Sequence, residues 1–159
     1  MSLLVRHVMT EAPKTLSTDM SAADAAGLMT SFDVGAIPVT DGDDVVGLVT
    51  DRDIVVRVVA ARQDPNGTSL GTIATKGLVT ASPDMGVAEA RRLMSEHQVR
   101  RLPVMKSDRL VGIVSIGDLA VTDPAKRAIG DTLEAVSVSQ STRSTNGGPE
   151  RGTPERTRR

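Results

Sequence analysis

The sequence repeats itself once, and this repeat constrains the fold of the 159 residues more than any other feature. When residues 8–54 are matched without a gap to residues 73–119, 65 positions further on, 17 of the 47 pairs are identical. The identical pairs include Thr10/Thr75, Met29/Met94, Pro38/Pro103, Gly47/Gly112, Val49/Val114 and Asp53/Asp118. A unit of about 50 residues buries too little surface to be stable alone, so we expect the two copies to pack together with pseudo-two-fold symmetry.

Each copy predicts the same order of elements, β-α-β-β-α, and therefore a mixed α/β (α+β) fold. Apolar side chains three and four residues apart predict helices, and β-branched runs separated by turn residues predict a hairpin. The expected elements are extended segments at 14–16 and 78–81, helices at 21–31 and 87–97, hairpin strands at 36–40, 45–50, 102–105 and 110–115, and second helices at 53–62 and 117–121. Ser17, Asp19, Ser82 and Asp84 are the expected N-caps of the first helices.

The chain is expected to divide into two repeats, a linker and a tail. We assign residues 3–63 to the first repeat and residues 73–136 to the second, which a helix at 124–136 is expected to close. Residues 64–72 form the linker, where Pro65 and Asn66-Gly67 predict a turn. Residues 137–159 are rich in Ser, Thr, Gly, Pro and Arg and lack apolar periodicity, so we expect a disordered tail.

Composition excludes several classes of function. The chain has no Cys, Trp or Tyr and one Phe, which excludes disulfides, cysteine-ligated metals and base-stacking platforms built from several rings. Residues 1–136 carry 14 Lys and Arg against 18 Asp and Glu, a mildly acidic balance that makes nucleic-acid binding an unfavourable interpretation. His7 and His97 have no second ligand at metal spacing. Since no apolar stretch approaches the ~20 residues of a membrane span, we expect a cytoplasmic protein without a membrane segment.

The end of each hairpin carries the motif Gly-φ-φ-(Ser/Thr)-x-x-Asp, at residues 47–53 and 112–118. One interpretation needs no ligand: a hydroxyl three residues before an acid at the start of a helix is close to a capping box. The alternative is a nucleotide site. The hydroxyls of Thr50 and Ser115 could reach a phosphate, whereas an ionised Asp53 or Asp118 only accepts hydrogen bonds and suits the two hydroxyls of a ribose.

These residues resemble a known family. The segments Gly35-Ala36-Ile37-Pro38-Val39 and Val99-Arg100-Arg101-Leu102-Pro103-Val104, together with the two hairpin-end motifs, resemble CBS domains, and the pair resembles a tandem CBS (Bateman) module over residues 3–122. The chain is similar to small stand-alone bacterial CBS-pair proteins, including those of the hypoxic-response type.

The resemblance implies binding of an adenosine ligand (AMP, ADP, ATP, S-adenosylmethionine or NAD) in clefts between the repeats. It implies that Asp53 and Asp118 hold the ribose and that Thr50 and Ser115 reach phosphate or ribose oxygens. It further implies that adenine lies against Leu48, Val79 and Pro103 in the first cleft and against Ile113, Thr15 and Pro38 in the second. The arginines implied at the phosphates are Arg100 and Arg101 in the first cleft and Arg52 in the second. Because Gly35 and Ala36 stand where the second repeat has Arg100 and Arg101, we expect unequal affinities.

The expected function is a regulatory sensor without catalysis. The sequence shows no catalytic or metal-ligating constellation, and no catalytic cofactor is expected. We expect a homodimer formed through the apolar helix at 54–61 and an unidentified downstream protein partner. The alternative is a ligand-free dimerising interaction module whose Arg-rich tail contacts an acidic partner.

Overall fold

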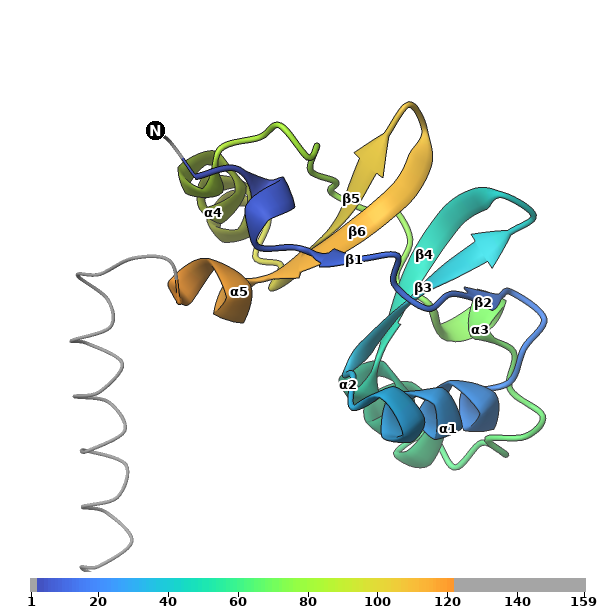
Figure 1. Ribbon diagram of the computed structural model, residues 1–159. Coiled ribbons are helices and arrows are strands. Elements are labelled where there is room, and N and C mark those ends of the chain that lie inside the picture. Colours follow the sequence, from blue (N-terminus) through green and yellow to red (C-terminus); the bar gives the residue numbers. More distant parts are fainter. Residues whose placement is uncertain (1–2, 122–159) are drawn as a thin grey trace, which may run out of the picture. The chain divides into compact units, whose positions relative to one another are not determined.

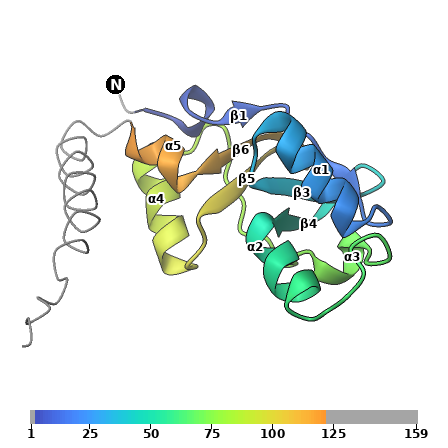
Figure 2. The same ribbon diagram turned by 90° about the horizontal axis from the view of Figure 1, so that it is seen from below.

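The computed structural model describes residues 3–121, and its helices and strands follow the repeat (Figures 1 and 2). The elements are, in chain order, the 3₁₀ helix η1 (Val5–His7), β1 (Thr10–Glu11), β2 (Leu16–Ser17), α1 (Ala22–Phe32), β3 (Ala36–Asp41), β4 (Asp44–Thr50), α2 (Asp51–Ile54), the π-helix η2 (Val55–Val59), α3 (Leu70–Ile73), α4 (Val87–Glu96), β5 (Arg101–Lys106), β6 (Arg109–Ser115) and α5 (Ile116–Ala120). The expected mixed α/β class and both hairpins are confirmed. The expected helix at 124–136 and the tail at 137–159 lie outside the described residues.

The structure has two three-stranded sheets. The order is β2-β3-β4 in the first repeat, and β1-β6-β5 in the second, which takes its edge strand β1 from the start of the first repeat. In the first, β2 runs parallel to β3, and β3 and β4 form an antiparallel hairpin whose turn places Gly42 at a φ of 59°. Small side chains of α1 pack on this sheet, so the core forms without aromatic rings. The buried residues shared by sheet and helices include Ala22, Ala25, Met29, Ile37, Val39, Val49 and Val58.

The helix α1 begins within one residue of the predicted start, but its cap differs from the prediction. Its N-cap is Ser21, whose hydroxyl accepts from the backbone N–H of Asp24 at 3.1 Å, while Asp24 Oδ2 accepts from the Ser21 backbone N–H at 2.9 Å. Hydrogen bonds from Ser21, first from its side chain and then from its backbone, lower the pKa of Asp24. The expectation that Ser17 and Asp19 cap this helix was wrong, because the Ser17 hydroxyl donates to the Asp19 carboxylate within the preceding turn.

The corresponding helix of the second repeat, α4, has no side-chain cap. It begins after Gly86, so the expectation that Ser82 and Asp84 cap it was also wrong. Asp84 instead forms an exposed ion pair with Arg6, at 2.7 Å. In both repeats, local turn hydrogen bonding places the helix start after the predicted caps.

The second helix of the first repeat changes its hydrogen-bonding pattern along its length. It is α-helical over α2 and a π-helix over η2, where the backbone N–H of Ala60 donates to Val55 O at 2.9 Å. Val58 is fully buried, whereas Val55, Val56 and Val59 are 57%, 51% and 64% exposed. The outer face of η2 is therefore an exposed row of valines.

Each repeat takes part of its core from the N-terminal segment of the other, which begins near residue 5 in the first repeat and near residue 70 in the second. Val5, in η1, is buried in the core of the second repeat, and Leu70, in α3, is buried in the core of the first. Equivalent hydrogen bonds hold both segments: the backbone N–H of Val5 donates to Met85 O at 2.9 Å, and that of Leu70 donates to Met20 O at 2.8 Å. The core of each repeat is therefore completed by the other, and the two repeats lie in one compact unit that ends at Leu119.

A glycine at the same position of each repeat lets these segments cross the hairpin. A Cβ on Gly47 would lie 2.9 Å from the Cβ of Ala74 and 3.0 Å from the carbonyl oxygen of Thr75. A Cβ on Gly112 would lie 3.1 Å from the carbonyl oxygen of Thr10. Glycine is therefore required at both positions, because the crossing segment lies too close to the hairpin to leave room for a Cβ.

Within residues 3–121, none of the helices combines the length and the apolar character needed to cross a lipid bilayer.

Candidate functional site

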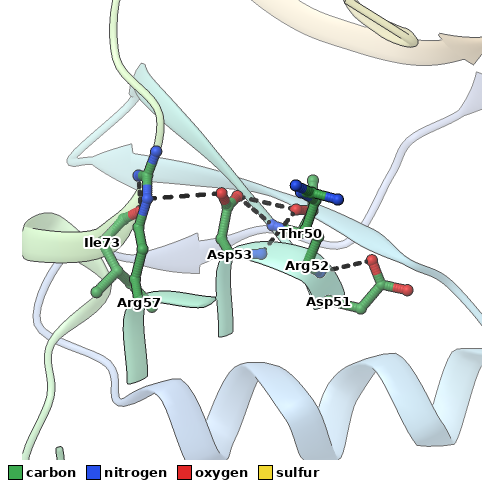
Figure 3. Close-up of polar contacts among 6 residues, drawn as sticks. All are labelled: Thr50, Asp51, Arg52, Asp53, Arg57 and Ile73. Atoms are coloured by element: carbon green, nitrogen blue, oxygen red, sulfur yellow. Dashed lines mark hydrogen bonds and ion pairs between the residues drawn. The ribbon is translucent and has the colours of Figure 1, made fainter. Parts of the chain in front are cut away.

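The two Gly-φ-φ-(Ser/Thr)-x-x-Asp motifs adopt the same local structure, a capping box. Asp53 Oδ2 accepts from the backbone N–H and from the hydroxyl of Thr50, both at 2.9 Å, and Thr50 Oγ1 accepts from the backbone N–H of Asp53 at 3.1 Å (Figure 3). Ser115 and Asp118 repeat this arrangement with distances of 2.7, 2.7 and 3.2 Å. The interpretation that needs no ligand is therefore realised in the structure, but it does not exclude a ligand.

The capping contacts use only one oxygen of each carboxylate. Asp53 Oδ1 lies 3.8 Å from Nε of Arg57, whose guanidinium also donates to the carbonyl oxygen of Ile73 (Figure 3). For Asp118 Oδ1, the described part of the chain provides no hydrogen-bond or ion-pair partner. Each motif thus holds a half-buried carboxylate in a fixed orientation while its second oxygen can still accept hydrogen bonds.

Two pockets contain these motifs. Pocket A, of about 540 Å³, is lined by Leu48, Thr50, Asp51, Arg52, Asp53, Thr75, Gly77, Leu78, Val79, Val99, Arg100, Arg101 and Pro103. Pocket B, of about 390 Å³, is lined by Thr10, Ala12, Pro13, Lys14, Phe32, Val34, Gly35, Ala36, Arg101, Ile113, Ser115 and Asp118. Both volumes fall in the range of small-molecule sites. Each pocket draws on both repeats, because the hairpin end of one repeat meets the N-terminal segment of the other, residues 10–14 in pocket B and residues 75–79 in pocket A.

The two pockets are built from equivalent positions of the repeat. The pairs related by the 65-residue shift are Thr10/Thr75, Ala12/Gly77, Pro13/Leu78, Lys14/Val79, Val34/Val99, Gly35/Arg100, Ala36/Arg101, Ile113/Leu48, Ser115/Thr50 and Asp118/Asp53. A pseudo-two-fold relationship therefore extends from the sequence to the walls of the pockets. The hydroxyl–carboxylate pair is common to both, whereas the charged residues around it differ.

The structure brings the residues expected in the first cleft together. All of them line pocket A: Leu48, Thr50, Asp53, Val79, Arg100, Arg101 and Pro103. Of those expected in the second cleft, Ile113, Ser115 and Asp118 line pocket B. Arg52 lines pocket A instead. Thr15 and Pro38 line neither pocket, since Thr15 is exposed elsewhere and Pro38 is fully buried in the core.

Sequence reasoning missed the most distinctive pair in pocket B, Lys14 and Phe32. Lys14 Nζ lies 5.0 Å from the centroid of the Phe32 ring, within the range of a cation–π contact, and the ring is 50% exposed. The apolar walls of pocket A are therefore aliphatic, whereas pocket B also contains the ring face of Phe32 and the ammonium group of Lys14. The repeat contained a signal for this difference, because the position equivalent to Phe32 is His97 and that equivalent to Lys14 is Val79.

Pocket A is rich in arginine. Arg52, Arg100 and Arg101 line it, and none of the three forms an ion pair within residues 3–121. Two carboxylates, those of Asp51 and Asp53, line the same pocket. Guanidinium groups without carboxylate partners suit the oxygens of a phosphate, which they can bind through two parallel hydrogen bonds.

Comparison with known proteins agrees with this geometry. The family model of the CBS domain matches the chain twice, over residues 5–60 and 70–122. The chain belongs to the CBS-domain family. The two matches correspond to the two repeats.

Relatives of the chain include other CBS domain-containing proteins. The CBS domain-containing protein YhcV of Bacillus subtilis (strain 168) is 38% identical over 133 residues, which cover 84% of this chain and 94% of YhcV. Hypoxic response protein 1 of Mycobacterium tuberculosis is 42% identical over 97 residues, covering 60% of this chain and 68% of the relative. A crystal structure of Hypoxic Response Protein I with two coordinated zinc ions covers 77% of this chain and all of that chain, with a TM-score of 0.69 and 36% identity.

A further structural neighbour holds adenosyl ligands. The CBS-domain pair of protein MJ0100 was crystallised in complex with 5′-methylthioadenosine and S-adenosyl-L-methionine, and it matches with a TM-score of 0.69 and 25% identity over 83% of this chain and 99% of that chain. Within residues 3–121, no three His, Cys, Asp or Glu side chains are grouped so that they could hold a metal ion.

Proposed function

We propose that this CBS pair is a non-catalytic regulatory module that binds an adenosine nucleotide, such as AMP, ADP or ATP, in pockets A and B. The observation that supports the proposal most directly is the hydroxyl–carboxylate pair at equivalent positions of both pockets, each of which Arg101 also lines. A carboxylate that only accepts hydrogen bonds suits a ribose diol, and a guanidinium suits a phosphate.

The adenosine part of the proposal is supported by the neighbour MJ0100, whose CBS pair is complexed with two adenosyl ligands. Adenine requires flat apolar walls. In pocket A these are Leu48, Val79 and Pro103, and in pocket B they are Ile113 and the Phe32 ring. The lining residues of both pockets include no histidine or cysteine, and we assign no catalytic residue and no catalytic cofactor.

Regulation would follow from the way each pocket is assembled. Each pocket lies between the hairpin end of one repeat and the N-terminal segment of the other. A ligand in either pocket therefore contacts both repeats at once. A ligand that binds one arrangement of these segments better than another shifts the population toward it. A protein partner that distinguishes the arrangements would then receive the signal.

We infer in addition that the chain self-associates through the valines of η2. Val55, Val56 and Val59 present adjacent apolar side chains to solvent, and such a surface is typical of an interface. This inference is independent of ligand binding.

The proposed function can be tested by thermal unfolding in the presence of AMP, ADP, ATP and S-adenosylmethionine, with GMP and ribose 5-phosphate as controls. A ligand at 100 times its Kd stabilises the folded state by about 2.7 kcal/mol, which raises the Tm by several degrees. We expect such a rise for one or more of the adenosine ligands and a smaller one for the controls. No rise with any adenosine ligand at millimolar concentration would contradict the proposal and favour a ligand-free interaction module.

A further inference from the structure

Arg101 occupies a singular position between the two pockets. It is the one residue, among those described, that lines both pocket A and pocket B. Arg52 and Arg100 line pocket A alone, and Lys14 lines pocket B alone. The position equivalent to Arg101 in the first repeat is Ala36, so the pseudo-symmetry provides no second guanidinium of this kind.

The contacts of Gly35 locate the end of the Arg101 side chain. A Cβ on Gly35 would lie 3.2 Å from Arg101 Nη2 and 3.2 Å from Asp51 Oδ2. Gly35 lines pocket B and Asp51 lines pocket A, and the backbone N–H of Asp51 donates to Gly35 O at 3.1 Å. The guanidinium therefore ends where the walls of the two pockets meet. The missing side chain at Gly35 leaves the space that Arg101 uses.

The charge of Arg101 is available to a ligand. The side chain is half-buried at the start of β5, and within residues 3–121 it has no carboxylate within ion-pair distance. Its planar fork can bind one phosphate with two parallel hydrogen bonds, but it cannot present that full set to two phosphates in different pockets.

We propose that Arg101 is a shared phosphate-binding residue, so that phosphate-bearing ligands in pockets A and B compete for its guanidinium and bind with negative cooperativity. This inference rests on the proposed nucleotide-binding function. The first ligand draws Arg101 toward its own phosphate, and the second binds to a pocket that has lost this cation. Adenosine, which has no phosphate, does not engage Arg101 and binds the two pockets independently.

The test measures each pocket separately by calorimetry. Asp118→Asn confines AMP to pocket A, and Asp53→Asn confines it to pocket B. In both backgrounds, Arg101→Gln is expected to weaken the binding of AMP about tenfold or more, because one charge-assisted interaction is lost. The affinity for adenosine is expected to stay unchanged. The matched variant Arg100→Gln removes a neighbouring guanidinium. It is expected to weaken the binding of AMP only in the Asp118→Asn background, which retains pocket A. Arg101→Lys keeps the charge and is expected to restore part of the affinity in both.

The outcomes separate this inference from the function on which it rests. If the unmodified chain binds neither AMP nor adenosine, the proposed function and the role of Arg101 are both overturned. If AMP binds but Arg101→Gln weakens its binding in one background alone, the nucleotide sites are supported and the sharing of Arg101 between them is overturned. In the unmodified chain, the second AMP should bind more weakly than AMP binds to the same pocket in its single-site background, and adenosine should show no such difference.

Discussion

Asp118 and Ser115 hold each other through three hydrogen bonds, two that Asp118 Oδ2 accepts at 2.7 Å and one that Ser115 Oγ accepts at 3.2 Å. Thr50 and Asp53 form the same closed arrangement in the other repeat. The carboxylates are thus oriented by the fold before a ligand arrives, and a site oriented in advance loses less entropy on binding.

The capping box predicts that stability and binding can be separated at Asp118. Asp118→Asn keeps an oxygen that can accept from Ser115 and removes the charge, whereas Ser115→Ala removes the hydroxyl from the cap. We expect Ser115→Ala to lower the free energy of unfolding by about 1 kcal/mol, and Asp118→Asn to lower it less. Urea unfolding measures both. Equal loss in the two variants would mean that the charge of Asp118 stabilises this hairpin end as much as the hydroxyl of Ser115 does.

The glycine at the hairpin crossing predicts a large effect from one methyl group. Gly47→Ala would place a Cβ 2.9 Å from the Cβ of Ala74 and 3.0 Å from the backbone oxygen of Thr75, so the two segments must separate. We expect a loss of about 1–3 kcal/mol, the usual cost of overpacking. The matched control is Gly27→Ala in α1, where a Cβ meets nothing within 4 Å and a gain of about 0.5–1 kcal/mol is expected. A neutral Gly47→Ala would show that the crossing is looser than described.

The cap of α1 predicts a pH-dependent contribution to stability. The hydrogen bonds of Ser21 lower the pKa of Asp24 in the folded state relative to its ordinary value of 3.8. A lowered folded pKa stabilises the fold above pH 3.8, and this contribution is lost as the pH falls through the folded pKa. We therefore expect Ser21→Ala to lower the Tm at neutral pH and the difference from the unmodified chain to shrink below pH 3.8. A difference that stays constant down to pH 2 would contradict the assignment.

The sequence predicted the repeated framework well because its signals are local. Hairpin strands, their glycines and the hydroxyl–carboxylate motifs appear twice at a fixed spacing, and the residues expected in the first cleft do line one pocket. The starts of α1 and α4 were predicted within one residue, but their caps were misassigned because Ser and Asp stabilise turns and caps by the same hydrogen bonds. Lys14 and Phe32 were missed because neither matches its equivalent in the other repeat, and their proximity depends on where α1 ends relative to the segment before β2.

The π-helix could not be predicted for a different reason. A run of valines restricts side-chain rotamers but does not distinguish α-type from π-type hydrogen bonding. Here Arg57 reaches from η2 to the carbonyl oxygen of Ile73 and to the carboxylate of Asp53.

The exposed face of η2 predicts that self-association depends on Val56 and Val59. Val56→Lys combined with Val59→Glu adds two charges of opposite sign to this face, and we expect a dimer to dissociate to a species of 16.7 kDa in sedimentation at micromolar concentration. Lys106→Glu, at the end of β5 in the other repeat, is the control and should leave the association unchanged. If the unmodified chain already sediments as the monomer, the proposed interface is refuted.

The stoichiometry of nucleotide binding tests the account most directly. Calorimetric titration with ATP or AMP should give two sites in the unmodified chain, one in Asp53→Asn, one in Asp118→Asn and none in the double variant. Each single variant should retain its Tm within a few degrees, because asparagine can preserve the capping box. Unchanged binding in the folded double variant would contradict the assignment of both carboxylates and with it the placement of the ligand in pockets A and B.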